Sequence, residues 1–156
     1  MNAPERLPDD FAPFGDDHGP LLTGAFAPVS DESIFTDPEV ITGAIPADLN
    51  GVYMRCGPNP RYAPQGRYHP FDGDGMVHAA QFRNGRLTVA NRWIRTAAFE
   101  REAEVGRAAY WGIRETLVGN EAKPLKDSGN TDLVGHAGRA LALWYMSGDA
   151  WVIDPL

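Results

Sequence analysis

Four histidines carry the widest range of chemistry in this chain, because an imidazole can bind a metal ion or transfer a proton near neutral pH. They are His18, His69, His78 and His136. No two of them have the H-x-x-x-H spacing of a local metal site, and the chain has no C-x-x-C pair. Distant strands of a β fold can still bring ligands together, but each histidine alone fits a structural or surface role better. The sequence therefore assigns no catalytic, cofactor-binding or metal-binding residue.

The run Asp72-Gly73-Asp74-Gly75 has the acidic and glycine content of a calcium loop. An EF-hand loop needs a glutamate at its twelfth position, and that position, counted from Asp72, is Arg83. The sequence instead predicts a tight turn in which the aspartate carboxylates bind nearby backbone amides.

Cys56 is the single cysteine, so the chain can form no internal disulfide and a reducing, cytoplasmic location is expected. Because no histidine is paired with it, we interpret Cys56 as a buried, unreactive thiol. Four large aromatic side chains are expected in the core: Trp93, Trp111, Trp144 and Trp151. No G-x-S-x-G, P-loop or G-x-G-x-x-G signature is present.

Composition narrows the fold and the partners. The chain of 156 residues has a net charge of −7, which argues against binding nucleic acid. It contains 17 glycines and 13 prolines, which favour many short strands joined by turns over a helical bundle. No apolar stretch approaches the ~20 residues that span a bilayer, and the first residues do not form a signal peptide.

The elements that must position these side chains are mainly strands. Residues 1–24 are expected to form an extended or disordered arm, and residues 25–50 an irregular segment. Residues 51–56 form a strand that Pro58 and Pro60 stop. Two further strands, 76–83 and 86–95, flank Asn84-Gly85, which is the strongest hairpin signal because a type I′ turn needs positive φ at both positions.

Alternation of residue types assigns one face to each arm of this hairpin. The first arm places Met76, His78, Ala80 and Phe82 on one face, and the second arm places Leu87, Val89, Asn91 and Trp93 on one face. A helix is expected over 97–115, weakened by Gly106 and Gly112, and a polar loop over 119–130. Two last strands are expected at 140–145 and 151–154.

Several blocks of this sequence resemble the carotenoid cleavage oxygenase family. RCGPNP, residues 55–60, is similar to R-N-G-P-N-P, with Cys56 in place of the usual asparagine. YHPFDGDGMVHA (68–79), NTDLVGHAGRALALW (130–144) and ITGAIPADLNG (41–51) also resemble the family, and the likeness extends over residues 20–156. The resemblance implies a mainly β fold, the N-terminal portion of a seven-bladed β-propeller with a short helical cap segment.

The resemblance also implies a chemistry. Family members hold one non-haem Fe(II) by four histidines from different blades, and glutamates orient three of these histidines. They use O2 to cleave a conjugated double bond of a carotenoid, apocarotenoid or stilbene. An apolar patch lets them take substrate from a membrane, so peripheral membrane contact is allowed. An isomerase branch with the same fold is not separable from the dioxygenases in this region.

None of the four iron histidines maps onto this chain. The first lies in a T-A-H-P-type segment beyond the last block, so the ligands are expected beyond residue 156. One of the orienting glutamates follows the LALW-like strand, where this chain has Tyr145. Residues 25–156 are therefore expected to be an incomplete propeller domain. Alone, the chain is expected to be inactive and either marginally stable or prone to aggregate. The alternative is a short non-catalytic β protein that binds a hydrophobic ligand or a partner chain.

Overall fold

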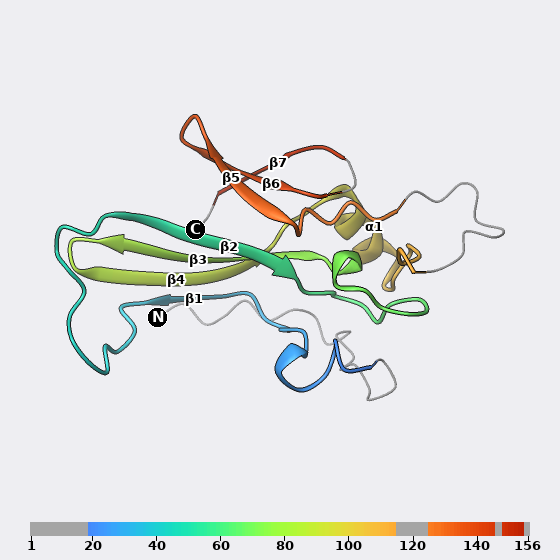
Figure 1. Cartoon of the computed structure of the whole chain (residues 1–156), viewed down its shortest axis with the longest axis horizontal. Coiled ribbons are helices and arrows are strands. Elements are labelled where there is room, and N and C mark those ends of the chain that lie inside the picture. The colour runs from blue at the N-terminus through green and yellow to red at the C-terminus, as the bar shows by residue number, and fades with distance from the viewer. Residues whose placement is uncertain (1–18, 115–124, 146–147, 155–156) are drawn as a thin grey trace.

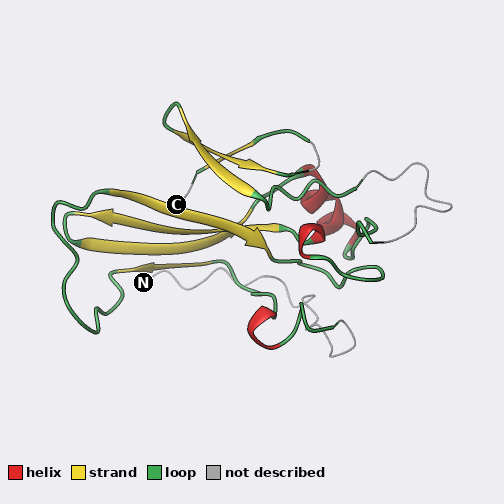
Figure 2. Cartoon of the chain, viewed as in Figure 1, coloured by secondary structure: helices red, strands yellow, loops and turns green. Residues whose placement is uncertain are grey.

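Two antiparallel β-sheets and one α-helix dominate the computed structural model, which describes residues 19–114, 125–145 and 148–154 (Figures 1 and 2). The first sheet has the order β1-β4-β3-β2 and the second the order β5-β6-β7. The mainly β class predicted from the sequence is confirmed for the described residues. The elements are η2 (Gly24–Phe26), β1 (Ser33–Thr36), β2 (Gly51–Pro58), η3 (Pro70–Asp72), β3 (Gly75–Arg83), β4 (Arg86–Trp93), α1 (Ala97–Val105), β5 (Asp132–His136), β6 (Arg139–Leu143) and β7 (Trp151–Ile153).

The central hairpin β3–β4 turns through Asn84 and Gly85, which have φ angles of 52° and 74°. These positive values are those of the predicted type I′ turn. The register places His78 opposite Asn91 and Ala80 opposite Val89, so the two faces predicted separately form one continuous face of the sheet.

The secondary structure predicted for three segments is wrong. The segment 25–50, predicted to be irregular, contains β1, which pairs with β4. The helix predicted over 97–115 ends at Val105, because Gly106 adopts a left-handed conformation with a φ of 66°. Strand β5, which precedes β6, was not predicted at all.

The predicted arm 1–24 is described only from Gly19 onward. Within that part Leu22 is 1% exposed and packed, whereas Pro20 and Gly24 are exposed. Among the described residues, no helix has the length and apolar composition needed to cross a bilayer.

The two sheets pack against each other through one face of the first sheet. The buried centre of this contact is Val77, Ile94 and Ala142, surrounded by Met54, Cys56, Leu133, Trp151 and Ile153. A second buried cluster joins Met76, Trp93 and Phe99, so helix α1 covers one end of the opposite face. Of the tryptophans expected in the core, Trp93 is buried and Trp111 is 37% exposed, which corrects the prediction for Trp111.

The rest of that opposite face of the first sheet is uncovered in the described chain, and we call it the open face. Phe35 and Tyr53 are 57% and 64% exposed there. A groove of about 290 Å³ lies over it, lined among others by Arg55, His78 and Val89. The first sheet therefore has one packed face and one largely apolar open face.

Candidate functional site around the Phe71 carbonyl

The acidic run predicted to be a turn begins as the short 3-10 helix η3. His69 Nδ1 accepts the Phe71 N–H at 3.2 Å, and Asp72 Oδ2 accepts the His69 N–H at 3.0 Å, which together cap the helix start. Asp72 Oδ1 also accepts the distant Ile113 N–H at 2.9 Å. The prediction that aspartate carboxylates bind nearby amides is thus confirmed for Asp72, and the same carboxylate binds a segment that follows α1.

Backbone carbonyls at the other end of η3 point toward the second sheet. Asn130 Nδ2 donates to the carbonyls of Gly73 at 2.7 Å, Phe71 at 3.2 Å and Pro70 at 3.3 Å. Trp144 Nε1 donates to the Phe71 carbonyl as well, at 3.3 Å. The Pro70 carbonyl also accepts the Gly73 N–H at 3.3 Å, and side chains just before β5 and just after β6 provide these further donors to the carbonyls of so short a helix.

The same junction fixes Thr131 and Tyr145. The Thr131 N–H donates to the Leu143 carbonyl at 3.0 Å, and Thr131 Oγ1 accepts the Tyr145 N–H at 3.1 Å. The Tyr145 ring packs on Phe71 with a centroid separation of 4.6 Å and lies 5.8 Å from the ring of Trp144. Thr131 and Tyr145 are both exposed, so this aromatic edge faces outward.

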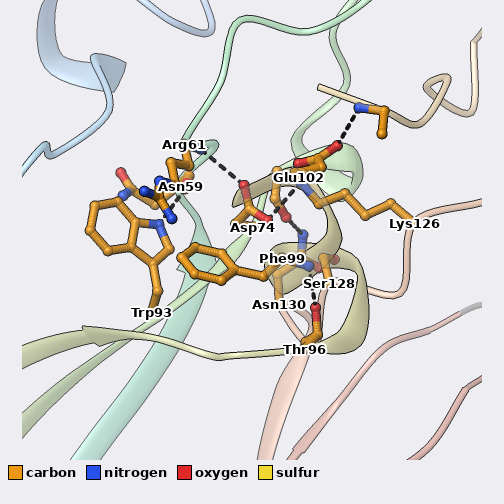
Figure 3. A network of polar contacts seen from close by, with 12 residues as sticks. Asn59, Arg61, Asp74, Trp93, Thr96, Phe99, Glu102, Lys126, Ser128 and Asn130 are labelled. Atoms are coloured by element: carbon orange, nitrogen blue, oxygen red, sulfur yellow. Dashed lines mark hydrogen bonds and ion pairs between the residues drawn. The ribbon is translucent and has the colours of Figure 1, made fainter. Parts of the chain in front are cut away.

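Asp74, Glu102 and Lys126 form a buried ion triad (Figure 3). Lys126 Nζ is 2.6 Å from Asp74 Oδ1 and 2.6 Å from Glu102 Oε2, and all three side chains are at most 8% exposed. Burial alone lowers the pKa of Lys126, but the two carboxylates outweigh it and raise that pKa. The triad joins the loop before β3, helix α1 and the segment that leads into β5.

Backbone amides stabilise the excess negative charge of this triad. Asp74 Oδ2 accepts the Arg61 N–H at 2.9 Å, and Glu102 Oε1 accepts the Ala109 N–H at 2.9 Å. Sequence reasoning missed the triad, because it placed Lys126 in a polar loop and the partners lie far apart in the chain. No spacing rule connects such residues.

The histidines do not come together. His69 caps η3, His78 lies on the open face, and His136 is exposed at the end of β5; His18 lies outside the described residues. Burial, with a smaller contribution from Arg55, lowers the pKa of His78. In the described parts of the chain, no three His, Cys, Asp or Glu side chains lie close enough to hold a metal ion. These residues therefore do not fit an iron site.

The Cys56 thiol is half-buried on the packed face of the first sheet. Burial, and secondarily the charge of Asp132, raises its pKa above the ordinary value. A raised pKa reduces the thiolate fraction, which agrees with the prediction of an unreactive side chain. The prediction that Cys56 is buried is corrected, because the thiol is only half-buried.

Three of the four sequence blocks described above therefore meet at one place, whereas the block 41–51 lies beside the β3–β4 turn. RCGPNP contacts the acidic run through the Asn59 N–H, which donates to the Asp74 carbonyl at 2.6 Å. The block that begins at Asn130 contacts the Phe71 carbonyl from both of its ends. The family model of the retinal pigment epithelial membrane protein matches residues 26–156, which contain all of these blocks. The chain belongs to the carotenoid cleavage oxygenase family.

Individual relatives agree with this assignment. A probable chloroplast carotenoid cleavage dioxygenase 4 of Arabidopsis thaliana is 48% identical over 86 residues, 55% of this chain and 14% of its own length. The lignostilbene dioxygenase of Pseudomonas brassicacearum has a similar structure, with a TM-score of 0.75 and 28% identity over 87% of this chain and 28% of its own. The chain thus spans less than a third of these relatives.

The apocarotenoid oxygenase of Synechocystis is a third relative. Its structures include a variant with a TM-score of 0.69 and 30% identity over 82% of this chain and 28% of its own. The solved variants replace a threonine, a tryptophan and a glutamate, of which the last two are adjacent and the threonine stands thirteen positions before the tryptophan. A cobalt-substituted form has also been solved, so members of the family hold a metal.

Proposed function

We propose that this chain is the N-terminal part of a non-haem Fe(II) dioxygenase that uses O2 to cleave a conjugated carbon–carbon double bond. The observation that carries the proposal is the family match over residues 26–156, together with the contact of the blocks 68–79 and 130–144 at the Phe71 carbonyl. Relatives named for carotenoid, apocarotenoid and lignostilbene substrates support this range of polyene and stilbene substrates. The single cysteine suits a cytoplasmic location.

The described residues do not supply the metal ligands. From the family resemblance, in which the first iron histidine follows the last matched block, we assign the four iron histidines, and the blades that complete a seven-bladed propeller, to polypeptide outside residues 1–156. What this chain contributes is a rigid pair of sheets and the aromatic edge around Tyr145. Alone it is expected to bind no stoichiometric iron, and iron binding with polyene cleavage by the isolated chain would overturn the proposal.

Tyr145 is a position at which we infer that this chain departs from the Synechocystis enzyme. The spacing of Thr131, Trp144 and Tyr145 equals that of the threonine, tryptophan and glutamate replaced in the Synechocystis enzyme. We therefore place Tyr145 where that enzyme has its glutamate. A tyrosine carries no negative charge at neutral pH, so it orients a neighbouring imidazole more weakly than a carboxylate.

A chimera tests both statements, because a chimera of the Synechocystis enzyme is already known to form a crystal structure. Residues 26–156 would replace the matched stretch of that enzyme, with Tyr145 retained in one version and changed by Tyr145→Glu in the other. We expect the Tyr145→Glu version to hold more iron and to incorporate 18O from 18O2 into both cleavage products. A folded chimera that cleaves nothing in either version would contradict the proposed function, and equal iron content would contradict the role of Tyr145.

The open face favours a second function, the binding of a hydrophobic ligand or a partner chain without catalysis. Its groove of about 290 Å³ is close to the ~300 Å³ lower limit of small-molecule sites. An open reading frame that continues past Leu156 with further histidines would favour the dioxygenase, whereas a stop codon there would favour this second function.

A further inference from the structure

Asn130 is a buried polar side chain whose amide nitrogen and amide oxygen both form hydrogen bonds. It is 5% exposed, and its amide nitrogen faces three carbonyl oxygens of the η3 segment at 2.7–3.3 Å. Its amide oxygen accepts the hydroxyl hydrogen of Thr131 at 3.3 Å. Because all of its donors point to carbonyls, the orientation of this amide is fixed, and its oxygen must face Thr131.

The Thr131 hydroxyl is therefore polarised by its neighbours. A hydroxyl has one donor and two acceptor lone pairs. The donor is used by Asn130 Oδ1, and one lone pair accepts the Tyr145 N–H at 3.1 Å. What remains is one lone pair on an exposed side chain at the aromatic edge beside Tyr145.

We propose that Asn130 is a positioning residue that holds the Thr131 hydroxyl as a hydrogen-bond acceptor at this edge. A group that docks against Thr131 must then bring a donor, such as water or another O–H or N–H. A carboxylate or carbonyl oxygen is disfavoured there, because it would meet a lone pair. This inference rests on the proposed function only in treating the Thr131–Tyr145 edge as part of the working site.

Two variants of Asn130 separate positioning from simple structural support. Asn130→Ala removes the donors to the η3 carbonyls and the acceptor for Thr131. Asn130→Asp also removes those donors but keeps an oxygen that can accept the Thr131 hydroxyl. Both variants lose the donors to the η3 carbonyls, and Asn130→Asp also places a carboxylate oxygen against them, so it is expected to be no more stable than Asn130→Ala. Only a positioning role predicts that Thr131 is nevertheless held better in Asn130→Asp.

The full 156-residue chain is used, with NMR as the measurement. We expect Asn130→Ala to release the Thr131 χ1 rotamer, seen in its scalar couplings, and to speed amide exchange at Tyr145 about fivefold relative to Asn130→Asp, the effect of one hydrogen bond. Equal Thr131 couplings and equal Tyr145 exchange in the two variants would overturn the proposal.

Thr131→Val and Thr131→Ser keep the test independent of the folding of the Asn130 variants. Thr131→Val keeps the branched shape without the hydroxyl and should speed Tyr145 exchange about fivefold, whereas Thr131→Ser should not. If Tyr145 exchange is unchanged in Thr131→Val, the polarised hydroxyl does not exist and the proposal fails. The chimera described above reports on the proposed function separately, because it measures iron and cleavage.

Discussion

Lys126 shows at the residue scale how this chain tolerates buried charge. One ammonium group lies between two carboxylates, each 2.6 Å away, and the remaining carboxylate oxygens accept backbone amides. Removing one member of such a group leaves an uncompensated charge in a low-dielectric interior, which costs more than the group contributes when it is intact. The triad is therefore sensitive to single substitutions at any of its positions.

Replacing this lysine tests the triad directly. We expect Lys126→Met to lower the free energy of unfolding by about 3–5 kcal/mol, because Asp74 and Glu102 remain buried without a cation. The measurement is urea denaturation. Arg101→Met is the matched control, since Arg101 pairs with Glu104 at the surface, with both side chains more than half exposed, and should change stability by no more than about 0.5 kcal/mol. Equal effects of the two substitutions would contradict the account.

The pH dependence of stability gives a second test of the same group. The folded chain raises the pKa of Lys126, so its contribution is fully present below the pKa of an unfolded lysine, about 10.4, and is lost as the pH rises through the folded value. We expect the unfolding free energy of the parent to fall more steeply above about pH 10.4 than that of Lys126→Met. Denaturation curves at several alkaline pH values measure this difference, and parallel pH profiles would contradict it.

The sequence predicts which blocks contribute to the site, but it does not predict which of their atoms are in contact. The acidic run and the block from Asn130 to Trp144 were singled out through the family resemblance. The place where they meet was not predicted, because it is the backbone carbonyl of Phe71. Every residue has such a carbonyl, so the sequence does not distinguish this one. Lys126 was placed in a polar loop for a related reason, since nothing local distinguishes a buried lysine from a solvated one.

At the scale of elements, Gly75 marks the closest approach between the start of β3 and the segment that enters the second sheet. A Cβ atom at Gly75 would lie 2.5 Å from the Ser128 carbonyl oxygen and 2.8 Å from Ile94 Cδ1. The Gly75 N–H donates to that same Ser128 carbonyl at 3.0 Å. The joint between the two sheets therefore has no room for a side chain here.

An alanine at this position should separate the two segments. We expect Gly75→Ala to destabilise the chain by about 1–3 kcal/mol, as overpacking of a close contact does. Gly57→Ala is the control in the adjacent strand β2, where a Cβ would meet nothing within 4 Å. The measurement is thermal denaturation of both variants. If Gly75→Ala is as stable as Gly57→Ala, the contact between Gly75 and the Ser128 segment adjusts to a methyl group and the prediction is wrong.

The elements that the sequence predicted well are those with strong local signals. Asn84-Gly85 has the turn chemistry that a two-residue hairpin requires, and the hairpin formed as expected. Strand β1 was missed because its four residues have no turn signal of their own and depend on pairing with β4. The predicted helix is too long because Gly106 ends it in a left-handed conformation, whereas helix propensity alone marks this glycine only as an unfavourable interior residue.

At the scale of the whole molecule, the open face leaves apolar side chains without a protein partner in the described chain. Phe35 and Tyr53 are more than half exposed on the two edge strands of this face, where both line the groove. Exposed apolar patches of this kind mark contact surfaces or cause aggregation. The prediction that the isolated chain is marginally stable or aggregates rests on this face.

Charged side chains on the open face should reduce self-association. We expect Phe35→Lys with Tyr53→Lys to shift the chain toward monomer in sedimentation velocity experiments, because the apolar surface is then solvated. The control pair is Val40→Lys with Ile41→Lys, which changes the net charge equally in an exposed segment away from the groove. A monomeric parent with a cooperative melt, or equal gains from both pairs, would contradict a specific role of the open face.

The hydrogen bonds from distant residues to the Phe71 carbonyl also predict which parts of the chain fold first. Its donors, Asn130 and Trp144, stand 59 and 73 residues away in the sequence, whereas the β3–β4 hairpin closes through a two-residue turn. Long loops lose more chain entropy on closure, so the hairpin should be structured in the rate-limiting transition state and the junction should not. In stopped-flow experiments, changes at Asn130 should therefore accelerate unfolding and leave the refolding rate nearly unchanged, while changes in the hairpin slow refolding.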